Sequence, residues 1–325
     1  MKTKERILLE LESHRGEYIS GERISETINV SRCAVWKGIE ALRNEGYIID
    51  GVTKLGYMLS ENDDTLTADG IRAHLPATAL DAFDINVVKI TGSTNADVKN
   101  AAALGAPEGY VIIAGEQSAG RGRMGRQFYS PGGSGVYLSI LLRPRSLPAD
   151  QVVSVTTAAA LAVCESIEEI TSETASIKWV NDIFVRGRKV CGILTEATFD
   201  AECGSVGTVI LGIGVNVNQP QGGFPPEINN IAGALLHERT PNIRNRLCAS
   251  ILCHILNRYR NLGTVSHTDE YRRRCFVVGK EVAVIRGNSS RHATAYGVDD
   301  ACRLLVIYDN EEREALSSGE ISIRL

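Results

Sequence analysis

The 325-residue sequence lacks the features that mark several large classes of protein. It has no apolar run long enough to span a membrane, and its first residues, MKTKER, lack the apolar core of a signal peptide. Its eight cysteines occur without a CxxC motif or paired Cys/His spacing, so neither a disulfide framework nor a zinc site is indicated. The net charge of −4 gives no overall attraction to nucleic acid. We therefore expect a cytoplasmic globular protein with reduced thiols, in which any DNA contact comes from a local patch.

The glycine-rich stretch GRGRMGRQFYSPGGSG, residues 120–135, does not meet the requirements of either of two common nucleotide-binding motifs. It contains G-x-G-x-x-G but lies between two strand-like runs, 110–114 and 136–142, whereas a dinucleotide-binding turn must open a helix. No G-K-[S/T] occurs here, which excludes a Walker loop. What remains is a loop whose arginines match phosphate or carboxylate oxygens and whose glycines let backbone N–H groups approach a ligand. This favours an anion- or nucleotide-binding loop over a mobile basic surface loop.

Residues 1–62 have the pattern of a winged helix-turn-helix. Apolar residues at helical spacing predict a helix over 4–13, and two short helices follow that Ser20 and Ser31 can cap. YIIDGVTKLGYMLS, residues 47–60, predicts two strands around a turn, the wing. Residues 1–60 hold 9 Lys and Arg against 9 Asp and Glu, so a protein-interaction module remains the alternative to DNA binding. The residues that the second short helix offers to DNA are Ser31, Arg32, Trp36, Lys37 and Arg43.

The rest of the chain predicts an α+β protein with two further domains. SENDDTLT, residues 60–67, is polar and predicts a linker. Residues 63–275 mix helices with hairpin-like strands, which predicts a mixed sheet with helices packed on it. Residues 276–325 form short runs separated by Gly, Asn and Asp turns, which fits a small SH3-like β-barrel. In the central domain we expect helices near 68–75, 95–104, 152–170, 244–262 and 267–275, and strands near 85–90, 176–179, 183–185, 190–196 and 206–217.

Four further stretches carry side chains suited to a small-molecule site. TGSTNAD, residues 91–97, follows a predicted strand and opens a helix, so Ser93, Thr94 and Asn95 present hydroxyls and an amide at a helix N-terminus. Helix capping alone would explain only one of these three residues. GEQSAGRG places Gln117 at a strand end just before the glycine loop. KWVNDIFVRGRKVCGILTEA predicts a hairpin, and LGIGVNVN is a strand whose glycines permit close approach. The side chains that these stretches contribute are Ser93, Thr94, Asn95, Gln117, Asn181, Asp182, Lys189, Glu196, Asn216 and Asn218, the last two on one face of their strand.

Together and in this order, these stretches resemble the biotin protein ligases, and with the winged helix the chain resembles the bifunctional type that also represses the biotin operon. The resemblance covers essentially the whole chain, and its most specific parts are GRGR-x-GR, KW-x-ND, K-x-x-GIL-x-E and GIG-x-N-x-N. The chain departs from the family in two places. Phe128 stands where the family often has Trp, and KWVND replaces the commoner KWPND. Both changes conserve size or an extended backbone, so neither puts the activity in doubt.

The resemblance implies an ATP-dependent ligase that forms AMP and diphosphate. Biotin and ATP, with Mg²⁺, first form biotinyl-5′-adenylate and pyrophosphate, and the acyl group then passes to a lysine of the biotin carboxyl carrier protein of acetyl-CoA carboxylase. It also implies a repressor that binds operator DNA as a ligand-induced homodimer, with no membrane partner. We expect the loop 218–228, rich in Gly and Pro, to close over the adenylate.

The resemblance also implies roles for individual residues. Lys189 holds the biotin carboxylate and then the α-phosphate. Arg123 and Asp182 complete the catalytic set. Asp182 has three possible roles: it anchors the metal, it orients Lys189, or it only occupies a hairpin turn. No side chain is assigned as a resident metal ligand. The residues implied to bind biotin are Ser93, Thr94, Asn95, Gln117, Arg121, Gly122, Arg123, Lys189 and Gly192. Those implied to bind ATP and the adenylate are Arg123, Arg126, Phe128, Lys189 and Asn216.

Three other functions are weighed against this one. A lipoate-type acyl ligase of the same fold would exchange the polar cluster that reads the ureido ring for an apolar tunnel. A transcription factor that only senses a ligand, without ligase activity, would have lost Lys189 or the arginines, and both are present. A scaffold protein would leave the glycine-arginine loop unexplained.

Overall fold

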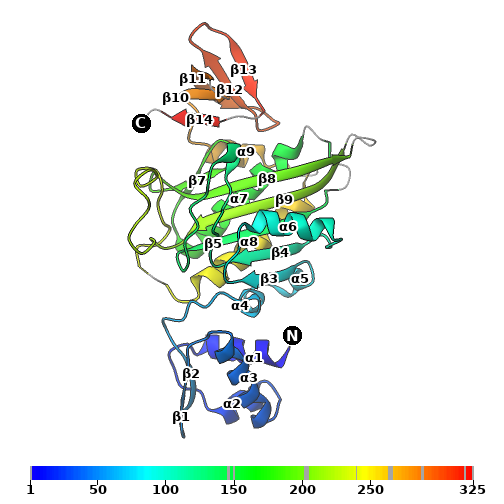
Figure 1. Cartoon of the computed structure of the whole chain (residues 1–325), viewed down its shortest axis with the longest axis vertical. Coiled ribbons are helices and arrows are strands. Elements are labelled where there is room, and N and C mark those ends of the chain that lie inside the picture. The colour runs from blue at the N-terminus through cyan, green and yellow to red at the C-terminus, as the bar shows by residue number, and fades with distance from the viewer. Residues whose placement is uncertain are drawn as a thin grey trace. The chain divides into compact units, whose positions relative to one another are not determined.

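Figure 1 shows the computed structural model of the chain. The structure describes residues 2–144, 147–148, 151–200, 205–238, 240–262, 266–286, 289–317 and 320–323. The chain forms two compact units. The first unit is Met1–Asp81 together with Glu238–Ser250, and the second unit is Ala82–His237 together with Ile251–Leu325.

The first unit contains the predicted winged helix-turn-helix. Ser20 Oγ accepts a hydrogen bond from the backbone N–H of Arg23, and Ser31 Oγ accepts one from Ala34, so both predicted caps are present. Buried apolar residues from all three helices form its core, as the helical spacing predicts. The wing is an antiparallel hairpin. The elements are α1 Thr3–Ser13, α2 Gly21–Thr27, α3 Arg32–Asn44, β1 Ile49–Val52 and β2 Gly56–Leu59.

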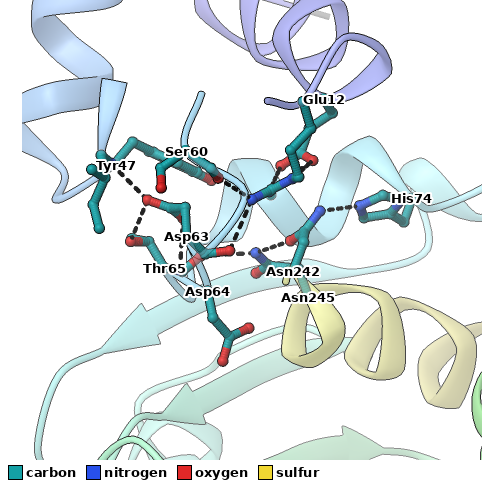
Figure 2. Close-up of polar contacts among 12 residues, drawn as sticks. Glu12, Tyr47, Ser60, Asp63, Asp64, Thr65, His74, Asn242 and Asn245 are labelled. Carbon is teal, nitrogen blue, oxygen red and sulfur yellow. Dashed lines mark hydrogen bonds and ion pairs between the residues drawn. The ribbon is translucent and has the colours of Figure 1, made fainter. Parts of the chain in front are cut away.

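The segment 60–67, predicted to be a linker, is fixed inside the first unit by hydrogen bonds. Asp63 is 1% exposed, and its carboxylate accepts from the backbone N–H groups of Ile48 at 2.6 Å and Thr65 at 2.9 Å. Its carbonyl oxygen accepts from Arg15 Nη1 at 2.9 Å and from the backbone N–H of Asn242 at 3.1 Å (Figure 2). This part of the chain is therefore folded structure rather than a free tether.

The partner of this segment is the first turn of helix α8, Ile243–Arg260. Asn245 Nδ2 donates to the carbonyl of Thr65 at 2.8 Å, and the Arg244 guanidinium pairs with Asp64 at 2.6 Å. Asn242 Nδ2 lies 2.8 Å from Nε2 of His74, which directly follows the short helix α4, Ala68–Ala73 (Figure 2). These pairs are separated by about 170 to 180 residues in sequence, so no local pattern could reveal them.

The second unit is built on a seven-stranded mixed sheet of order β3-β4-β5-β9-β8-β7-β6. β3 and β4 are parallel and all other neighbours are antiparallel, which confirms the predicted mixed sheet. Every residue of β5 is buried, so both faces of the sheet are covered at its centre. The strands are β3 Asp84–Val88, β4 Tyr110–Ala114, β5 Gly135–Leu142, β6 Ala175–Lys178, β7 Asp182–Val185, β8 Arg188–Asp200 and β9 Ser205–Asn216.

Helices of the second unit cover this sheet where the sequence predicts them. α6, Thr94–Ala103, packs against β4, β5 and β9, and α7, Val152–Thr171, packs against β6, β7 and β8 (Figure 1). α9, Thr268–Arg274, lies beside β6. One short helix of the first unit, α5 at Ala77–Leu80, has no counterpart among the predicted elements. Within the described ranges, no helix combines the length and the apolar character that crossing a bilayer requires.

The C-terminal residues form the predicted small β-structure, a five-stranded antiparallel sheet of order β13-β12-β11-β10-β14. Alternate residues are buried along β10 and β12, the period expected of strands with one packed face. The strands are β10 Glu281–Arg286, β11 Ser289–Val298, β12 Leu304–Tyr308, β13 Arg313–Leu316 and β14 Glu320–Ile323. The fold is therefore α+β, as predicted.

Candidate functional site

A cavity of about 270 Å³ lies in the second unit, and it gathers the predicted ligand residues from separate parts of the chain. The N-terminus of α6, the glycine-arginine loop between β4 and β5, and the neighbouring strands β7, β8 and β9 all contribute to its wall. The predicted biotin, ATP and catalytic residues that line it are Ser93, Thr94, Asn95, Gln117, Arg121, Gly122, Arg123, Arg126, Phe128, Asp182, Lys189, Gly192 and Asn216.

Three strand glycines make room for the side chains that form the pocket wall. Gly192 and Gly214 are directly paired across β8 and β9, and the ring of Phe128 packs over both. A Cβ at Gly214 would come within 2.5 Å of that ring. At Gly212 a Cβ would come within 2.0 Å of Asn95 Oδ1, so glycine at this position lets Asn95 approach the sheet.

The glycine-arginine loop is an ordered turn. The N–H of Gly122 donates to the carbonyl of Arg126 at 2.7 Å, and the N–H of Phe128 donates to Gly120 at 3.0 Å. The guanidinium of Arg123 donates to Asn181 Oδ1 at 2.9 Å, which ties the loop to the turn between β6 and β7. Arg126 is exposed. The loop therefore holds one arginine against the pocket wall and leaves another at its rim.

Lys189 and Asp182 form an ion pair in the pocket, with Nζ 2.7 Å from Oδ1 and side chains 29% and 19% exposed. Between β7 and β8 the register shifts, so that Ile183 pairs with Cys191 but Phe184 pairs with Lys189. Such a bulge bends the strand and re-aims the side chains beside it. The ion pair between Asp182 and Lys189 supports one of the roles predicted for Asp182, the orientation of Lys189. Among the described residues, no group of three His, Cys, Asp and Glu side chains is placed to hold a metal ion.

The segment after β9 forms another wall of the pocket. Phe224, Ile228, Ile231 and Ala232 line the cavity, so the predicted closing loop does reach it, and the wall extends beyond its predicted end at residue 228. Two backbone hydrogen bonds of 2.8 Å tie Lys189 to this segment, one from its N–H to the carbonyl of Ile231 and one to its carbonyl from Gly233. The apolar character of Ile231 and Ala232 was the available signal for these wall residues.

The two asparagines of LGIGVNVN differ in environment. Asn216 lines the cavity, and its Nδ2 donates to the carbonyl of Gly233 at 3.0 Å. Asn218 lies beyond the end of β9, is 6% exposed and does not line the cavity. Within the described part of the chain its Oδ1 is buried without a hydrogen-bond partner.

Around the start of α6, hydrogen bonds fix the polar end of the pocket. Gln117 Oε1 accepts from the backbone N–H of Thr94 at 2.9 Å, and its Nε2 donates to Ser130 Oγ at 3.0 Å. Ser93 occupies the N-cap position, but its side chain makes no capping hydrogen bond. Trp179, which sequence reasoning did not assign, also lines the cavity, and the Trp179–Val180 peptide bond is cis.

In the winged helix, most of the predicted DNA-contacting side chains are exposed. Trp36 is 54% exposed, Lys37 is exposed, and the side chain of Arg32 is 72% exposed. Ser31 is exposed at the N-cap of α3. Arg43 was predicted to be exposed, but it is half-buried. Its guanidinium donates to the carbonyl of Ile49 at 2.9 Å and to the carboxylate of Glu40 at 2.8 Å. It therefore ties the wing to α3, a contact that sequence cannot show because it depends on how the hairpin folds back.

Comparisons with known proteins agree with this arrangement. The model of the biotin/lipoate A/B protein ligase family matches residues 87–216, an HTH domain model matches 3–58, and the biotin protein ligase C-terminal domain model matches 277–324. The bifunctional ligase/repressor BirA of Bacillus subtilis is 36% identical over 327 residues, which cover 97% of each chain. The chain belongs to the biotin protein ligase family. Its combination of domains is that of the family's bifunctional ligase/repressors.

Two further family members show how widely the similarity extends. BirA of Escherichia coli is 28% identical, over 95% of this chain and 94% of that protein. The solved structure of a biotin protein ligase from Aquifex aeolicus, in complex with biotin and ATP, is 27% identical with a TM-score of 0.61 and covers 74% of this chain and 98% of that one.

Proposed function

We propose that this protein is a biotin protein ligase that forms biotinyl-5′-adenylate, transfers biotin to a carrier-protein lysine, and represses transcription by binding operator DNA. DNA binding is assigned to residues 1–62 and ligase chemistry to 63–275, with the C-terminal domain at 276–325. The observation that carries the proposal is one pocket lined both by an uncharged polar cluster and by cationic side chains, among them Arg123, Arg126 and Lys189.

The pocket has the chemistry that biotin and ATP require. Biotin has a neutral ureido ring, which needs hydrogen-bond donors and acceptors without charge, and a carboxylate, which needs a cation. Thr94, Asn95 and Gln117 supply the first kind of group and Lys189 supplies the second. The ring of Phe128 lines the pocket and offers an aromatic surface on which a flat adenine can stack. An apolar tunnel for a lipoyl chain would not need the uncharged cluster.

The reaction proceeds in two displacements. A biotin carboxylate oxygen attacks the α-phosphorus of ATP, and the bond to pyrophosphate breaks. The amine of a carrier lysine then attacks the acyl carbon, AMP departs, and the amine loses a proton. The first step brings two anions together, so cations fixed before the reaction lower its barrier. Asp182 holds Lys189 at 2.7 Å and so limits where its charge can lie.

Mg²⁺ is proposed as a companion of ATP. When bound, it neutralises phosphate charge and stabilises the departing pyrophosphate. Magnesium usually keeps waters and phosphate oxygens and takes one or two protein carboxylates. Among the described residues, Asp182 is the carboxylate that lines the pocket, and it already pairs with Lys189, so the site fits a metal carried mainly by the nucleotide.

The decisive experiment incubates the purified protein with biotin, ATP and MgCl₂, with and without an apo biotin carboxyl carrier protein. We expect pyrophosphate release and label on one carrier lysine. Lipoate replaces biotin in a parallel reaction, and the expected result there is no carrier label. Preferential lipoylation would establish the alternative ligase, and ligand binding without pyrophosphate release would establish a sensor without ligase activity.

A further inference from the structure

A chain of buried hydrogen bonds runs behind the polar end of the pocket. Asn95 Nδ2 donates to Glu196 Oε2 at 2.7 Å, and Ser139 Oγ lies 2.6 Å from Asn95 Oδ1 and 2.7 Å from Thr94 Oγ1. Ser139 is fully buried, and Asn95 and Thr94 are 4% and 3% exposed. Thr94 and Asn95 line the cavity, whereas Ser139 and Glu196 do not. The last two therefore act on a ligand only through their neighbours.

Glu196 fixes the direction of the hydrogen bonds that follow. A carboxylate oxygen accepts, so the amide of Asn95 must turn its NH₂ toward Glu196 and its Oδ1 toward Ser139. An amide oxygen also only accepts, so the single hydroxyl hydrogen of Ser139 is committed to Asn95. In a reversed arrangement the oxygen of the buried Asn95 amide would face a Glu196 oxygen, acceptor against acceptor.

Thr94 is then left with two acceptors for its one hydrogen. Its Oγ1 lies 2.7 Å from Ser139 Oγ, which has no hydrogen left to give, and 3.1 Å from Gln117 Oε1, which is an acceptor. Whichever of the two takes the Thr94 hydrogen, the hydroxyl turns only lone pairs toward the pocket. A ligand atom that meets Thr94 must therefore be a donor.

The sheet is built around this arrangement. Ser139 on β5 is paired directly with Gly212 on β9, and Gly212 is paired with Leu194 on β8, two residues before Glu196. A Cβ at Gly212 would meet Asn95 Oδ1 at 2.0 Å, so glycine here gives Asn95 the space between its two partners. Residues of three neighbouring strands thus cooperate to hold one amide in one orientation.

We propose that Ser139 and Glu196 are positioning residues that force Thr94 to act as a hydrogen-bond acceptor and so select ligands with an N–H at that point. The inference rests on the proposed function, in which the ring bound there is the ureido group of biotin, with two N–H groups. An analogue whose N–H is replaced by oxygen or by N-methyl is then rejected. Specificity for the ring comes from two side chains that never touch it.

The test measures pyrophosphate release as a function of biotin, of ATP, and of an N-methyl biotin. Ser139→Ala leaves the Thr94 hydrogen with only its longer contact, to Gln117 Oε1 at 3.1 Å, and Glu196→Gln allows the Asn95 amide to take either orientation. We expect each to raise the KM for biotin about tenfold and to weaken discrimination against the analogue about tenfold, with the KM for ATP within about twofold. Glu281→Gln, an exposed glutamate of β10, is the matched control and leaves all three constants unchanged.

A double variant separates this role from simple loss of structure. Glu196→Gln combined with Asn95→Asp exchanges the amide and the carboxylate, so that Ser139 again faces an obligatory acceptor. We expect it to recover discrimination that Glu196→Gln alone has lost. If the wild-type protein biotinylates its carrier and both single variants discriminate as well as it does, the proposed roles of Ser139 and Glu196 are overturned while the ligase assignment stands. If the wild-type protein releases no pyrophosphate with biotin, the ligase assignment itself fails.

Discussion

Single residues in the pocket differ in whether their charge or their contacts matter most. The ammonium group of Lys189 forms an ion pair with Asp182 at 2.7 Å, and the backbone of Lys189 is hydrogen-bonded to the segment that contains Ile231. Both restraints lower the cost of placing an ammonium beside two reacting anions, because little reorganisation remains for the reaction itself.

Lys189→Ala is therefore expected to reduce adenylate formation by about 100-fold or more while the protein stays folded. Pyrophosphate release is the measurement, with circular dichroism to verify the fold. Lys99→Ala, at an exposed position of α6, is the control. A rate within a few-fold of the wild type for Lys189→Ala would remove Lys189 from the mechanism.

Arg123 combines charge with a structural contact, since its guanidinium donates to Asn181 Oδ1 at 2.9 Å. Arg123→Gly removes both, and the loop that encloses the reactive mixed anhydride loses its tie to the neighbouring turn. We expect adenylate to escape and acylate lysines of bystander proteins. The measurement is biotin label on serum albumin added to the reaction. Label confined to the carrier at an unchanged rate would show that the loop does not retain the intermediate.

In the second unit, a cluster of charged side chains joins helices α7, α8 and α9. His254 on α8 lies 3.3 Å from Glu165 and 3.0 Å from Glu169 on α7, and Arg258 on α8 joins Glu165 at 2.6 Å and Glu270 on α9 at 2.7 Å. Hydrogen bonds that His254 donates to Glu165 and Glu169 raise the pKa of His254 against the opposing effect of burial. For Glu165, burial acts to raise the pKa, but hydrogen bonds from His254 and Arg258 outweigh it and lower the pKa to about 2.

The raised pKa of His254 sets the sign of a pH effect. A group whose pKa is higher in the folded state contributes stability below its unfolded pKa, about 6.5, and loses that contribution as pH rises through the folded value. His254→Gln is expected to cost about 0.5 kcal/mol of unfolding free energy at pH 6 and less at pH 8. Urea unfolding at both pH values measures this, with His292→Gln at an exposed position of β11 as control. Equal losses at pH 6 and pH 8 would contradict it.

At the scale of the whole molecule, the segment that follows the wing is itself folded as part of the first unit. The hydrogen bonds of Asp63 and Asn245 bind the segment after the wing to the start of α8 (Figure 2). The residues that precede α8 follow directly in sequence from the wall segment that contains Ile231 and Ala232. The segment that lines the pocket therefore continues, along the sequence, into the first unit, which contains the winged helix.

We expect operator binding to depend on biotinyl-adenylate. A winged helix with 9 basic and 9 acidic residues in positions 1–60 makes few net phosphate attractions, so one copy binds weakly and a ligand-induced dimer gains by avidity. Sedimentation and operator binding are measured with and without biotin and ATP, and operator DNA must in turn tighten dimerisation of the liganded protein. Equal operator affinity with and without ligand would falsify the switch. Deletion of residues 1–62 is the control, expected to abolish DNA binding while the ligase keeps part of its activity.

The sequence by itself determined the parts of this protein that depend on neighbours in the chain. The helices of the winged domain, the caps at Ser20 and Ser31 and the approximate positions of the strands along the chain follow from periodicity and capping over a few residues. The candidate pocket residues lie in short motifs at strand ends and turns, and the resemblance of those motifs to the biotin protein ligases supplied their roles.

Only the tertiary structure decided which side chains meet. It placed Arg43 against the wing, joined Asp63 to Asn242, and put Glu196 behind Asn95, a pair 101 residues apart. These contacts depend on how distant segments pack. The contact of Glu196 also depends on strand register, because a shift of one residue in β8 would turn its side chain to the opposite face of the sheet. The physical reason is that hydrogen bonds between distant residues are selected by the folded state as a whole, so no local pattern in the sequence encodes them.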